Sequence, residues 1–256
     1  MNPDPIDCLI VGGGPAGLTA AIYAARFRLS VCVFDAGQSR AELIPCTHNH
    51  AGFPDGISGR DLLERMRMQA GKYGAQLRQA AVTRIEAGEA GFTAEANADA
   101  MRARAVLLAT GVTNRRPDMP EDLHRAALAA GRLRYCPVCD GFEVIDQEVA
   151  VIGTGARGVK EAKFLRAYTD KVTLIAPAGA HELSADDRRA LAGAGIALAD
   201  GPTVDFALTQ SGLSFSSALG RRSFEAVYPA MGSDAHSDLG EALGAALTSE
   251  GCIKVD

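Results

Sequence analysis

Residues 6–17 read Ile-Asp-Cys-Leu-Ile-Val-Gly-Gly-Gly-Pro-Ala-Gly, an apolar run that passes directly into a glycine-rich turn. The run predicts a buried strand at Ile6 to Val11, and the Ala-rich residues after the turn predict a helix that ends near Arg28. A second apolar strand is expected at Val31 to Phe34, and Asp35 closes it. Strand, turn, helix, strand and acid in this order are the fingerprint of a dinucleotide-binding unit.

Each defining residue of this fingerprint has a physical role in binding a nucleotide. Gly12, Gly14 and Gly17 permit a tight turn, close approach of the backbone to a pyrophosphate, and close packing of the helix. Asp35 can accept a hydrogen bond from a ribose hydroxyl. The sequence therefore predicts a nucleotide site here rather than a plain tight turn.

A second unit of the same pattern follows in the latter half of the chain. Its first strand is expected at Val149 to Ile152, and Gly153, Gly155 and Gly158 repeat the spacing of the earlier glycines. The next strand is expected at Val172 to Ile175. The chain therefore carries one internal repeat, a duplicated nucleotide unit.

The two units differ at the position that would bind a ribose. Where the first unit has Asp35, the second has Ala176, followed by Pro-Ala-Gly. A nicotinamide dinucleotide needs an acid there, or an Arg cluster for a 2′-phosphate, and this segment supplies neither. The sequence argues against ordinary NADPH binding, although Arg157 or Arg188 could reach the phosphate by another route.

A cysteine pair precedes the second unit. Residues 136–141 read Cys-Pro-Val-Cys-Asp-Gly, and two cysteines at this spacing can close a small disulfide loop that cycles between oxidised and reduced forms. The alternatives are a static disulfide and half of a zinc site. Structural zinc needs four ligands, and the remaining cysteines form no second pair at ligand spacing: Cys8, Cys32, Cys46 and Cys252. No metal site is therefore expected.

Length and composition limit the classes of function. The 256 residues suggest about two domains, and 47% hydrophobic with 22% charged residues is ordinary for a globular core. A net charge of −5 with scattered Lys and Arg gives no footprint for nucleic acid. The N-terminus is unlike a secretory signal, and no apolar run approaches the ~20 residues that span a bilayer. A cytoplasmic protein with no membrane role is expected.

Several motifs together resemble the low-molecular-weight thioredoxin reductase family along the whole chain. Those that carry the likeness are Gly12-Gly-Gly-Pro-Ala-Gly17, Asn49-His-Ala-Gly-Phe-Pro54, Ser58-Gly59, Gln69-Ala-Gly-Lys-Tyr-Gly-Ala75, Ala109-Thr-Gly111, Tyr135-Cys-Pro-Val-Cys-Asp-Gly141, Ala230-Met-Gly232 and Gly251-Cys-Ile-Lys-Val-Asp256. The resemblance implies an α/β fold with two Rossmann-like FAD/NAD(P)-binding domains, the second inserted in the first. The expected domains are residues 1–113, the inserted residues 114–235 with the cysteine pair, and the return at 236–256.

The resemblance also implies a cofactor and the residues that hold it. FAD is expected at the first turn, and Gly153 and Gly155 of the second turn are counted with the nucleotide-binding residues. The expected FAD contacts are Gly12, Gly14, Pro15, Ala16, Gly17, Asp35, Asn49, the backbone near Val82, Thr110 and Gly111. The histidines on either side of Asn49 are given no role, because loop histidines are more often solvated or packing residues.

The implied activity is electron transfer between the flavin and the cysteine pair. Cys139 is expected beside the flavin ring, Cys136 is expected to exchange disulfides with the substrate, and Asp140 is the expected proton donor or acceptor. An Asp before a Gly is also a common turn residue, so this role stays open beside a structural one. The expected partner is a thioredoxin-like protein or a small-molecule dithiol or disulfide, and the expected assembly is a homodimer.

Two departures from the family bear on these expectations. The family's His-Arg-Arg phosphate clamp is replaced by Ala176-Pro177-Ala178. Relatives without this clamp include dithiol oxidases of the gliotoxin and holomycin type, which pass electrons to oxygen, and ferredoxin-fed or otherwise unusual disulfide reductases. NADPH use and the direction of electron flow therefore stay open, and a non-enzymatic redox sensor is a further alternative. The chain stops at Asp256, where the family continues, so the C-terminal part of the FAD domain is expected to be missing and FAD to be held weakly.

Overall fold

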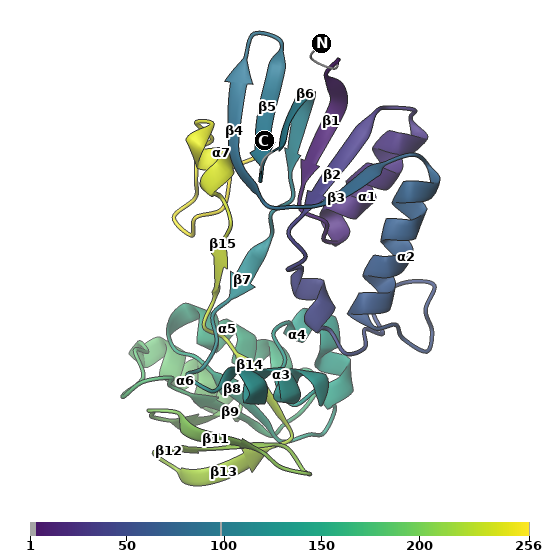
Figure 1. Cartoon of the computed structure of the whole chain (residues 1–256). Helices are drawn as coiled ribbons and strands as arrows, with labels where there is room; N and C mark the ends of the chain where they lie inside the picture. The colour runs from purple at the N-terminus through teal and green to yellow at the C-terminus, as the bar shows by residue number, and fades with distance from the viewer. Residues whose placement is uncertain (1–3, 98, 256) are drawn as a thin grey trace. The chain divides into compact units, whose positions relative to one another are not determined.

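The computed structural model describes residues 4–97 and 99–255 and divides into two compact units (Figure 1). The first unit combines the chain up to Ile44, Ser58–Thr113 and the chain from Asp234 onward. The second unit combines Pro45–Ile57 with Asn114–Ser233. Asp256, the end of the predicted return segment, lies outside the described residues. The arrangement agrees with the predicted α/β fold in which one nucleotide-type unit interrupts the other.

The first unit alternates strands and helices around a central sheet. Its elements in chain order are β1 (Ile6–Val11), α1 (Pro15–Arg26), β2 (Val31–Asp35), the 3-10 turn η1 (Arg40–Leu43), α2 (Gly59–Lys72), β3 (Gln76–Gln79), β4 (Val82–Gly88), β5 (Gly91–Ala96), β6 (Asp99–Leu108) and α7 (Asp238–Ala242). The predicted strands and the predicted helix after the first turn are confirmed, and the helix ends at Arg26 rather than near Arg28.

The sheet of the first unit runs in the order β3-β2-β1-β6-β5-β4. Strands β3, β2, β1 and β6 are parallel, whereas β5 and β4 join as an antiparallel hairpin on the far edge. In a parallel sheet of this kind a nucleotide binds beyond the carboxyl ends of the strands, where the strand order reverses. Here the order reverses between β1 and β6, and the glycine turn follows the carboxyl end of β1 while Asp35 ends the adjacent β2.

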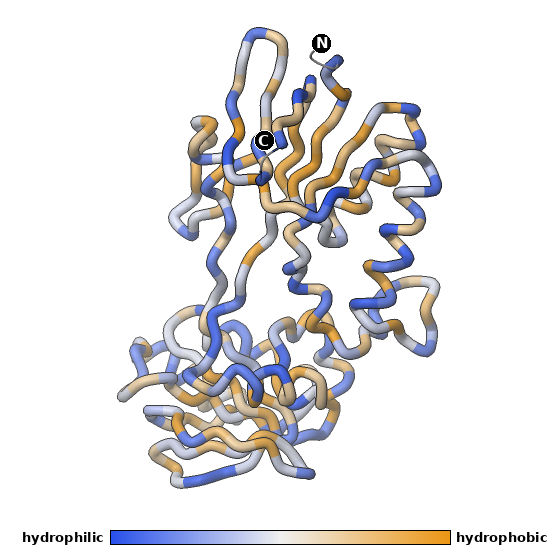
Figure 2. Tube along the Cα trace, in the orientation of Figure 1, coloured by the Kyte–Doolittle hydropathy of each residue, from blue (hydrophilic) through white to orange (hydrophobic). Residues whose placement is uncertain are grey.

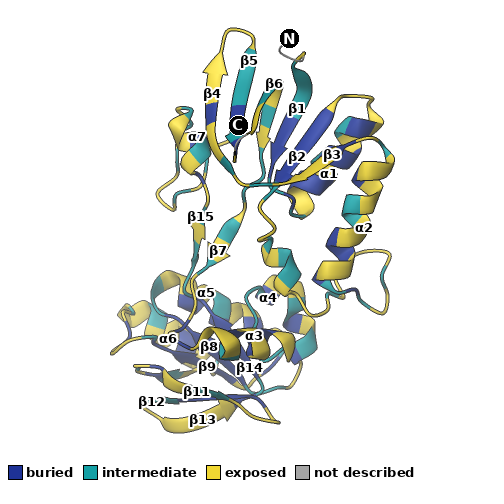
Figure 3. Cartoon of the chain, viewed as in Figure 1, coloured by how far each residue is buried: buried dark blue, intermediate teal, exposed yellow. Residues whose placement is uncertain are grey.

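Apolar residues on both faces of these strands form the core. Successive side chains of a strand point to opposite sides, so Ile10 and Val33 pack with Ile22 of α1 on one face. On the other face, Leu9 lies in a cluster that Leu239 of α7 covers. Figure 2 shows the hydrophobic residues running along β1 and β2, and Figure 3 shows most of β2 and the second half of β1 as buried. Burial on two faces fixes the strands that position the turn.

The second unit repeats this plan with an added antiparallel layer. Its elements are α3 (Glu121–Ala129), α4 (Pro137–Asp140), the 3-10 turn η2 (Gly141–Val144), β8 (Val149–Ile152), α5 (Gly155–Leu165), β9 (Val172–Ile175), α6 (Ala185–Gly193), β10 (Ala197–Ala199), β11 (Val204–Leu208), β12 (Leu213–Ser217), β13 (Gly220–Phe224) and β14 (Ala226–Pro229). A parallel sheet runs in the order β10-β9-β8-β14, and a separate antiparallel sheet runs β11-β12-β13. The predicted strands at 149–152 and 172–175 are confirmed.

Two clusters of apolar side chains fill the second unit. Helices α5 and α6 cover one face of the parallel sheet, where Leu165 and Leu191 join Val151 and Leu174. Helix α3 and the antiparallel sheet contribute to the cluster on the other face, where Phe215 lies with residues of β8 and β14. The parallel sheet is therefore buried on both faces, as its continuous apolar strands predict.

The chain crosses between the units along two short strands and at the ends of one loop. Strands β7 (Val112–Asn114) and β15 (Ser233–Ala235) pair with each other in a two-stranded ribbon. The predicted limits place residues 45–57 in the first domain, whereas the loop Pro45–Ile57 packs with the second unit. The domain limits themselves stay a prediction. No helix among the described residues is long and apolar enough to cross a membrane.

Candidate functional site

The first glycine turn has backbone geometry that requires glycine at two positions. Gly12 has φ +112°, and a Cβ there would overlap the carbonyl oxygen of Ala109. A Cβ at Gly17 would overlap the carbonyl oxygen of Gly12, so α1 can approach the turn closely only because residue 17 has no side chain. Gly14 is the N-cap of α1, and Pro15 begins the helix.

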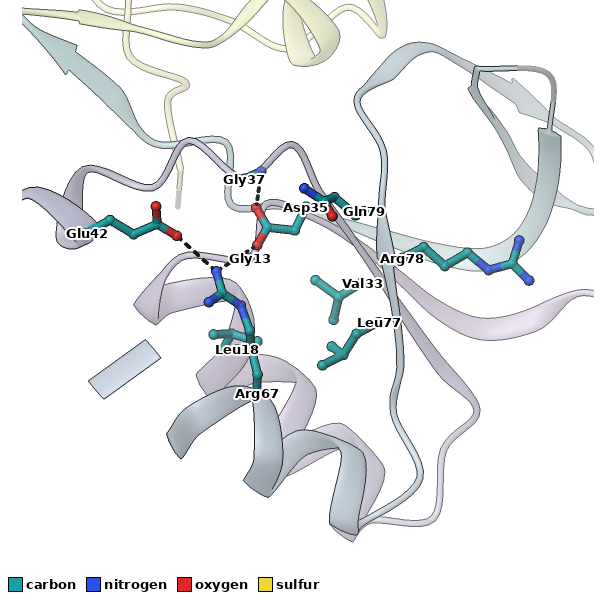
Figure 4. Close-up of a pocket in the computed structure, with 10 residues that line it drawn as sticks. All are labelled: Gly13, Leu18, Val33, Asp35, Gly37, Glu42, Arg67, Leu77, Arg78 and Gln79. Carbon is teal, nitrogen blue, oxygen red and sulfur yellow. Dashed lines mark hydrogen bonds and ion pairs between the residues drawn. The ribbon is translucent and has the colours of Figure 1, made fainter. Parts of the chain in front are cut away.

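Asp35 lies at the end of β2 beside this turn and is held from two sides (Figure 4). Its Oδ1 accepts a hydrogen bond from the Gly37 amide at 2.9 Å, and its Oδ2 pairs with Arg67 of α2 at 3.2 Å. Arg67 also pairs with Glu42 of η1 at 3.2 Å. These contacts fix the orientation of the carboxylate predicted to bind a ribose.

A cavity of about 450 Å³ opens between these side chains. Figure 4 shows the apolar side chains of Val33 and Leu77 together, and Leu18 beside Arg67, which reaches towards Asp35. An apolar wall beside a few fixed polar groups is typical of a site for a flat, partly polar ligand such as a nucleotide base and its ribose.

Two further cavities continue along the carboxyl ends of β1 and β2. One of about 500 Å³ is lined by the glycine turn, and it also contacts Ser39, Arg40, Thr110 and Gly111. The other, of about 230 Å³, is lined by Gly12, Val82 and Thr110. The predicted residues Pro15, Ala16, Val82, Thr110 and Gly111 therefore line cavities that the turn also lines. Their chemistry fits an extended dinucleotide: amide donors at the turn, an acid at one end and apolar walls.

His236 also lines both of these cavities, and no motif in the sequence indicates this position. Its Nδ1 contacts the carbonyl oxygen of Thr110 at 2.9 Å, and its amide donates to the carbonyl of Gly111 at 3.1 Å. The Thr113 hydroxyl contacts its Nε2 at 2.8 Å. The segment that returns to the first unit is thereby fastened to the Thr110–Gly111 turn.

Asn49 and these cavities belong to different units. It lies in the loop Pro45–Ile57, which belongs to the second unit, and its Oδ1 accepts a hydrogen bond from the Thr47 hydroxyl at 2.7 Å. Its predicted contact with FAD therefore stays a prediction.

The cysteine pair is a disulfide in the second unit. Cys136 and Cys139 are bonded, with their Cα atoms 5.1 Å apart. Cys136 caps the short helix α4 and accepts hydrogen bonds at its carbonyl from the amides of Cys139 and Asp140. Cys139 is exposed, whereas Cys136 is half-buried. The pair is therefore held in a compact turn with one sulfur-bearing residue open to solvent.

Asp140, the residue after the pair, makes contacts that spacing alone does not reveal. Tyr228 of β14 donates to its Oδ1 at 2.8 Å, and Arg134 pairs with its Oδ2 at 3.0 Å. Burial raises the pKa of Asp140, and Arg134 and Tyr228 offset part of this effect. The carboxyl group is thus oriented beside the disulfide with its affinity for a proton increased.

The second glycine turn keeps the packing role of its glycines. A Cβ at Gly153 would lie 2.8 Å from Cβ of Ala230, and one at Gly158 would lie 2.9 Å from the carbonyl carbon of Gly153. Gly155 has φ +59° and begins α5. The close approach of the helix to the turn is therefore repeated, whereas Gly155 is the first residue of α5 and its counterpart Gly14 is the N-cap of α1.

The loop after β9 folds onto that second turn. The Thr154 hydroxyl oxygen accepts a hydrogen bond from the Glu182 amide at 2.9 Å and lies 3.4 Å from Nδ1 of His181. His181 is buried, and its Nε2 donates to the carbonyl oxygen of Leu174 at 3.1 Å. Asp200 accepts from the His181 amide at 3.0 Å. His181 and Glu182 of this loop thus take up the Thr154 hydroxyl of the turn.

Ala176, at the counterpart of Asp35, is fully buried and its amide donates to the carbonyl of Ala199. It provides no acceptor for a ribose hydroxyl. Among the described residues, no group of three or more His, Cys, Asp or Glu side chains is placed to hold a metal ion.

Comparison with known proteins places these features in a family. A family model described as pyridine nucleotide-disulphide oxidoreductase matches residues 6–256. The thioredoxin reductase of Mycolicibacterium smegmatis is 39% identical over 171 residues, which cover 66% of this chain and 54% of that protein. The thioredoxin reductase of Streptomyces coelicolor is 36% identical over 176 residues, covering 67% of this chain and 54% of that protein. The matched segment thus spans about half the length of these relatives.

Solved structures extend the likeness over the whole fold. The crystal structure of HlmI has a TM-score of 0.88 and 30% identity and covers all of this chain and 81% of that chain. The thioredoxin reductase of Streptococcus pyogenes has a TM-score of 0.87 and 27% identity, covering 98% of this chain and 84% of its own.

Proposed function

Since this chain belongs to the pyridine nucleotide-disulphide oxidoreductase family, we propose that it is a FAD-dependent dithiol–disulfide oxidoreductase. Two electrons pass between the flavin and the Cys136–Cys139 pair, and then to or from a protein or small-molecule disulfide or dithiol. The observation that carries the proposal is a partly exposed disulfide beside an oriented carboxyl group, in a chain whose other unit has cavities lined by a dinucleotide-type glycine turn.

The residues of the first unit bind and orient the cofactor. The amides at the glycine turn would bind the pyrophosphate and Asp35 would accept from the ribose, while Val82, Thr110 and Gly111 line the continuation of the cavities. When bound, FAD supplies a carrier for two electrons.

The residues of the second unit handle sulfur and protons. Reduction of the disulfide takes two electrons and two protons and leaves two thiols, and oxidation reverses this balance. Cys139 is the sulfur assigned to the flavin side, and Cys136 is assigned to exchange with the substrate. Asp140, oriented by Arg134 and Tyr228, takes or gives a proton beside the pair.

An anaerobic spectral titration of FAD-reconstituted protein tests this proposal. Dithiothreitol should bleach the flavin absorbance through the cysteine pair, and Cys139→Ser should abolish fast bleaching. Cys252→Ser, which changes an exposed cysteine of the first unit, is the matched control and should behave as the unchanged chain does. Equal bleaching rates in the Cys139→Ser protein and the unchanged chain would remove the support for an enzyme and favour a redox sensor.

A second candidate has a specific observation in its favour. Because the loop after β9 takes up the Thr154 hydroxyl of the second turn and Ala176 lacks an acceptor, oxygen rather than NADPH is a candidate electron partner. The chain would then be a dithiol oxidase. Flavin bleached by a dithiol and restored by air, with no bleaching by NADPH or NADH, is the result expected for an oxidase. Rapid bleaching by NADPH is the result expected for a reductase.

The finer properties rest on the family resemblance. We propose a homodimer in the cytoplasm whose partner is a thioredoxin-like protein or a small dithiol. Sedimentation of the FAD-loaded protein at several concentrations checks the dimer, and a monomer at all of them would contradict it.

A further inference from the structure

A thiol, an imidazole and a carboxylate outside the cysteine pair lie in contact within the second unit. Cys46 Sγ is 3.6 Å from Nε2 of His48, and Nδ1 of the same ring is 3.0 Å from Oε1 of Glu143. Cys46 and Glu143 contact opposite nitrogens of the His48 ring, so the three groups form a linear relay rather than a set of metal ligands. A nucleophile, a base and a group that orients the base are arranged in this way in thiol enzymes.

The contact with Glu143 decides which ring nitrogen carries the proton. An ionised carboxylate only accepts hydrogen bonds, so Nδ1 of His48 donates to it. In the neutral ring Nε2 then has a free electron pair, and this nitrogen faces the thiol of Cys46. His48 is therefore oriented to take the proton of Cys46.

The Glu143 carboxylate meets that ring through one oxygen, because its Oε1 lies 3.0 Å from Nδ1. Its Oε2 is buried and accepts no hydrogen bond from the described residues. Proton transfer from Cys46 to His48 would place an imidazolium beside Oε1 and leave a thiolate, which is the reactive form of cysteine.

The backbone of the loop is built to bring the thiol and the ring together. Thr47 and Ile57 exchange backbone hydrogen bonds of 2.8 and 3.0 Å, which close the loop. Gly56 has φ +78°, and a Cβ there would lie 2.5 Å from Sγ of Cys46 and 2.7 Å from Cδ2 of His48. Only glycine leaves room for this contact.

The thiol is also open to reagents. Cys46 is a free, exposed cysteine, and His48 is exposed, whereas Glu143 is mostly covered in η2, just after the disulfide turn. A reactive sulfur at the surface with its supporting acid beneath can meet a small molecule from solvent.

We propose that Cys46, His48 and Glu143 form a second thiol site at which Cys46 takes a low-molecular-weight disulfide into a mixed disulfide. His48 Nε2 takes the Cys46 proton, and the thiolate attacks one sulfur of the small disulfide. A new bond forms to Sγ, the original S–S bond breaks, and its electron pair goes to the departing thiolate. That thiolate takes the proton from His48, so one thiol is consumed, one is released and no other oxidant is needed.

The test measures the reactivity of the Cys46 thiol in a variant that lacks the Cys136–Cys139 disulfide. In a Cys136→Ser/Cys139→Ser double variant, the reagents are iodoacetamide and the uncharged bis(2-hydroxyethyl) disulfide, with peptide mass spectrometry to locate each adduct. Because neither reagent reaction needs flavin, the result does not depend on the proposed function. Cys252, also exposed and free, is the reference thiol within the same molecule.

Cys46 is expected to react about ten-fold faster than Cys252 near neutral pH and to carry the mixed disulfide. His48→Asn should bring its rate to about that of Cys252, and Glu143→Gln, which keeps the shape of the side chain, should slow it several-fold. A Cys46 rate equal to that of Cys252, or one that His48→Asn and Glu143→Gln leave unchanged, would overturn the proposal. Absence of the Cys46 adduct with the small disulfide would overturn it as well.

Discussion

Replacing Tyr228 by Phe removes one hydroxyl from the interior of the second unit and tests the environment of Asp140. The Tyr228 side chain is fully buried, and its hydroxyl donates to Oδ1 of Asp140 at 2.8 Å. A hydrogen bond to a charged group contributes about 1.5–3 kcal/mol, whereas one between neutral groups contributes about 0.5–1.5 kcal/mol. Tyr228→Phe should therefore lower the free energy of unfolding of this unit by about 1.5–3 kcal/mol near neutral pH.

The loss should depend on pH in a defined direction. Burial raises the pKa of Asp140 above its ordinary value of 3.8, so protonated Asp140 contributes stability that is fully present below that value and is lost as the pH rises through the folded pKa. Removal of the Tyr228 hydroxyl takes away a donor to the charged form and raises this pKa further. The variant should therefore lose most stability at neutral pH and least in acid.

Denaturant unfolding followed by circular dichroism measures this loss at several pH values, and a double-mutant cycle isolates the pair. In an Asp140→Asn background, Tyr228→Phe should cost about 0.5–1.5 kcal/mol at every pH, because no carboxylate is present. An equal loss in both backgrounds, or one that does not shrink in acid, would refute the role assigned to this hydrogen bond.

Three further predictions concern the two glycine turns. Asp35→Asn should weaken FAD binding by about ten-fold or more, since a charge-assisted contact to the ribose is lost, and a titration of flavin fluorescence measures this; unchanged affinity would remove Asp35 from the site. Gly17→Ala should destabilise the first unit by about 1–3 kcal/mol in denaturant unfolding, because its Cβ would overlap the carbonyl oxygen of Gly12; no loss would contradict this. Thr154→Val removes the acceptor of the Glu182 amide and should speed hydrogen exchange of that amide, whereas an unaltered exchange rate would show that the loop is held by other contacts.

The features that the sequence predicted are those encoded in short spacings. The glycine turns, their flanking strands and the Cys136–Cys139 pair depend on residues close together in the chain, and each was found where the spacing placed it. The end of α1 was less accurate, because Phe27 closes the helix and Arg28 adopts φ +66° without a glycine to signal it.

The partners of the site residues could not be predicted in the same way. Tyr228 is far from Asp140 in the sequence, and no residue of its apolar strand indicates which group accepts its hydrogen bond. A signal was nevertheless present, since a tyrosine in a buried strand needs a partner for its hydroxyl. The pairing of Arg67 with Asp35 and of His48 with Glu143 depends on how distant segments pack, and a motif contains no such information.

The loop that follows β9 limits how a nicotinamide-type site could be engineered into this chain. Introducing an acid at position 176 would place a charge where the present side chain is fully buried, at a cost of several kcal/mol unless the backbone moved. His181 would still donate to the carbonyl oxygen of Leu174 and lie beside the Thr154 hydroxyl. Asp200 would still accept a hydrogen bond from the His181 amide. A graft that exchanges residues 176–184 together is therefore the smallest change expected to place a ribose acceptor beside the second turn.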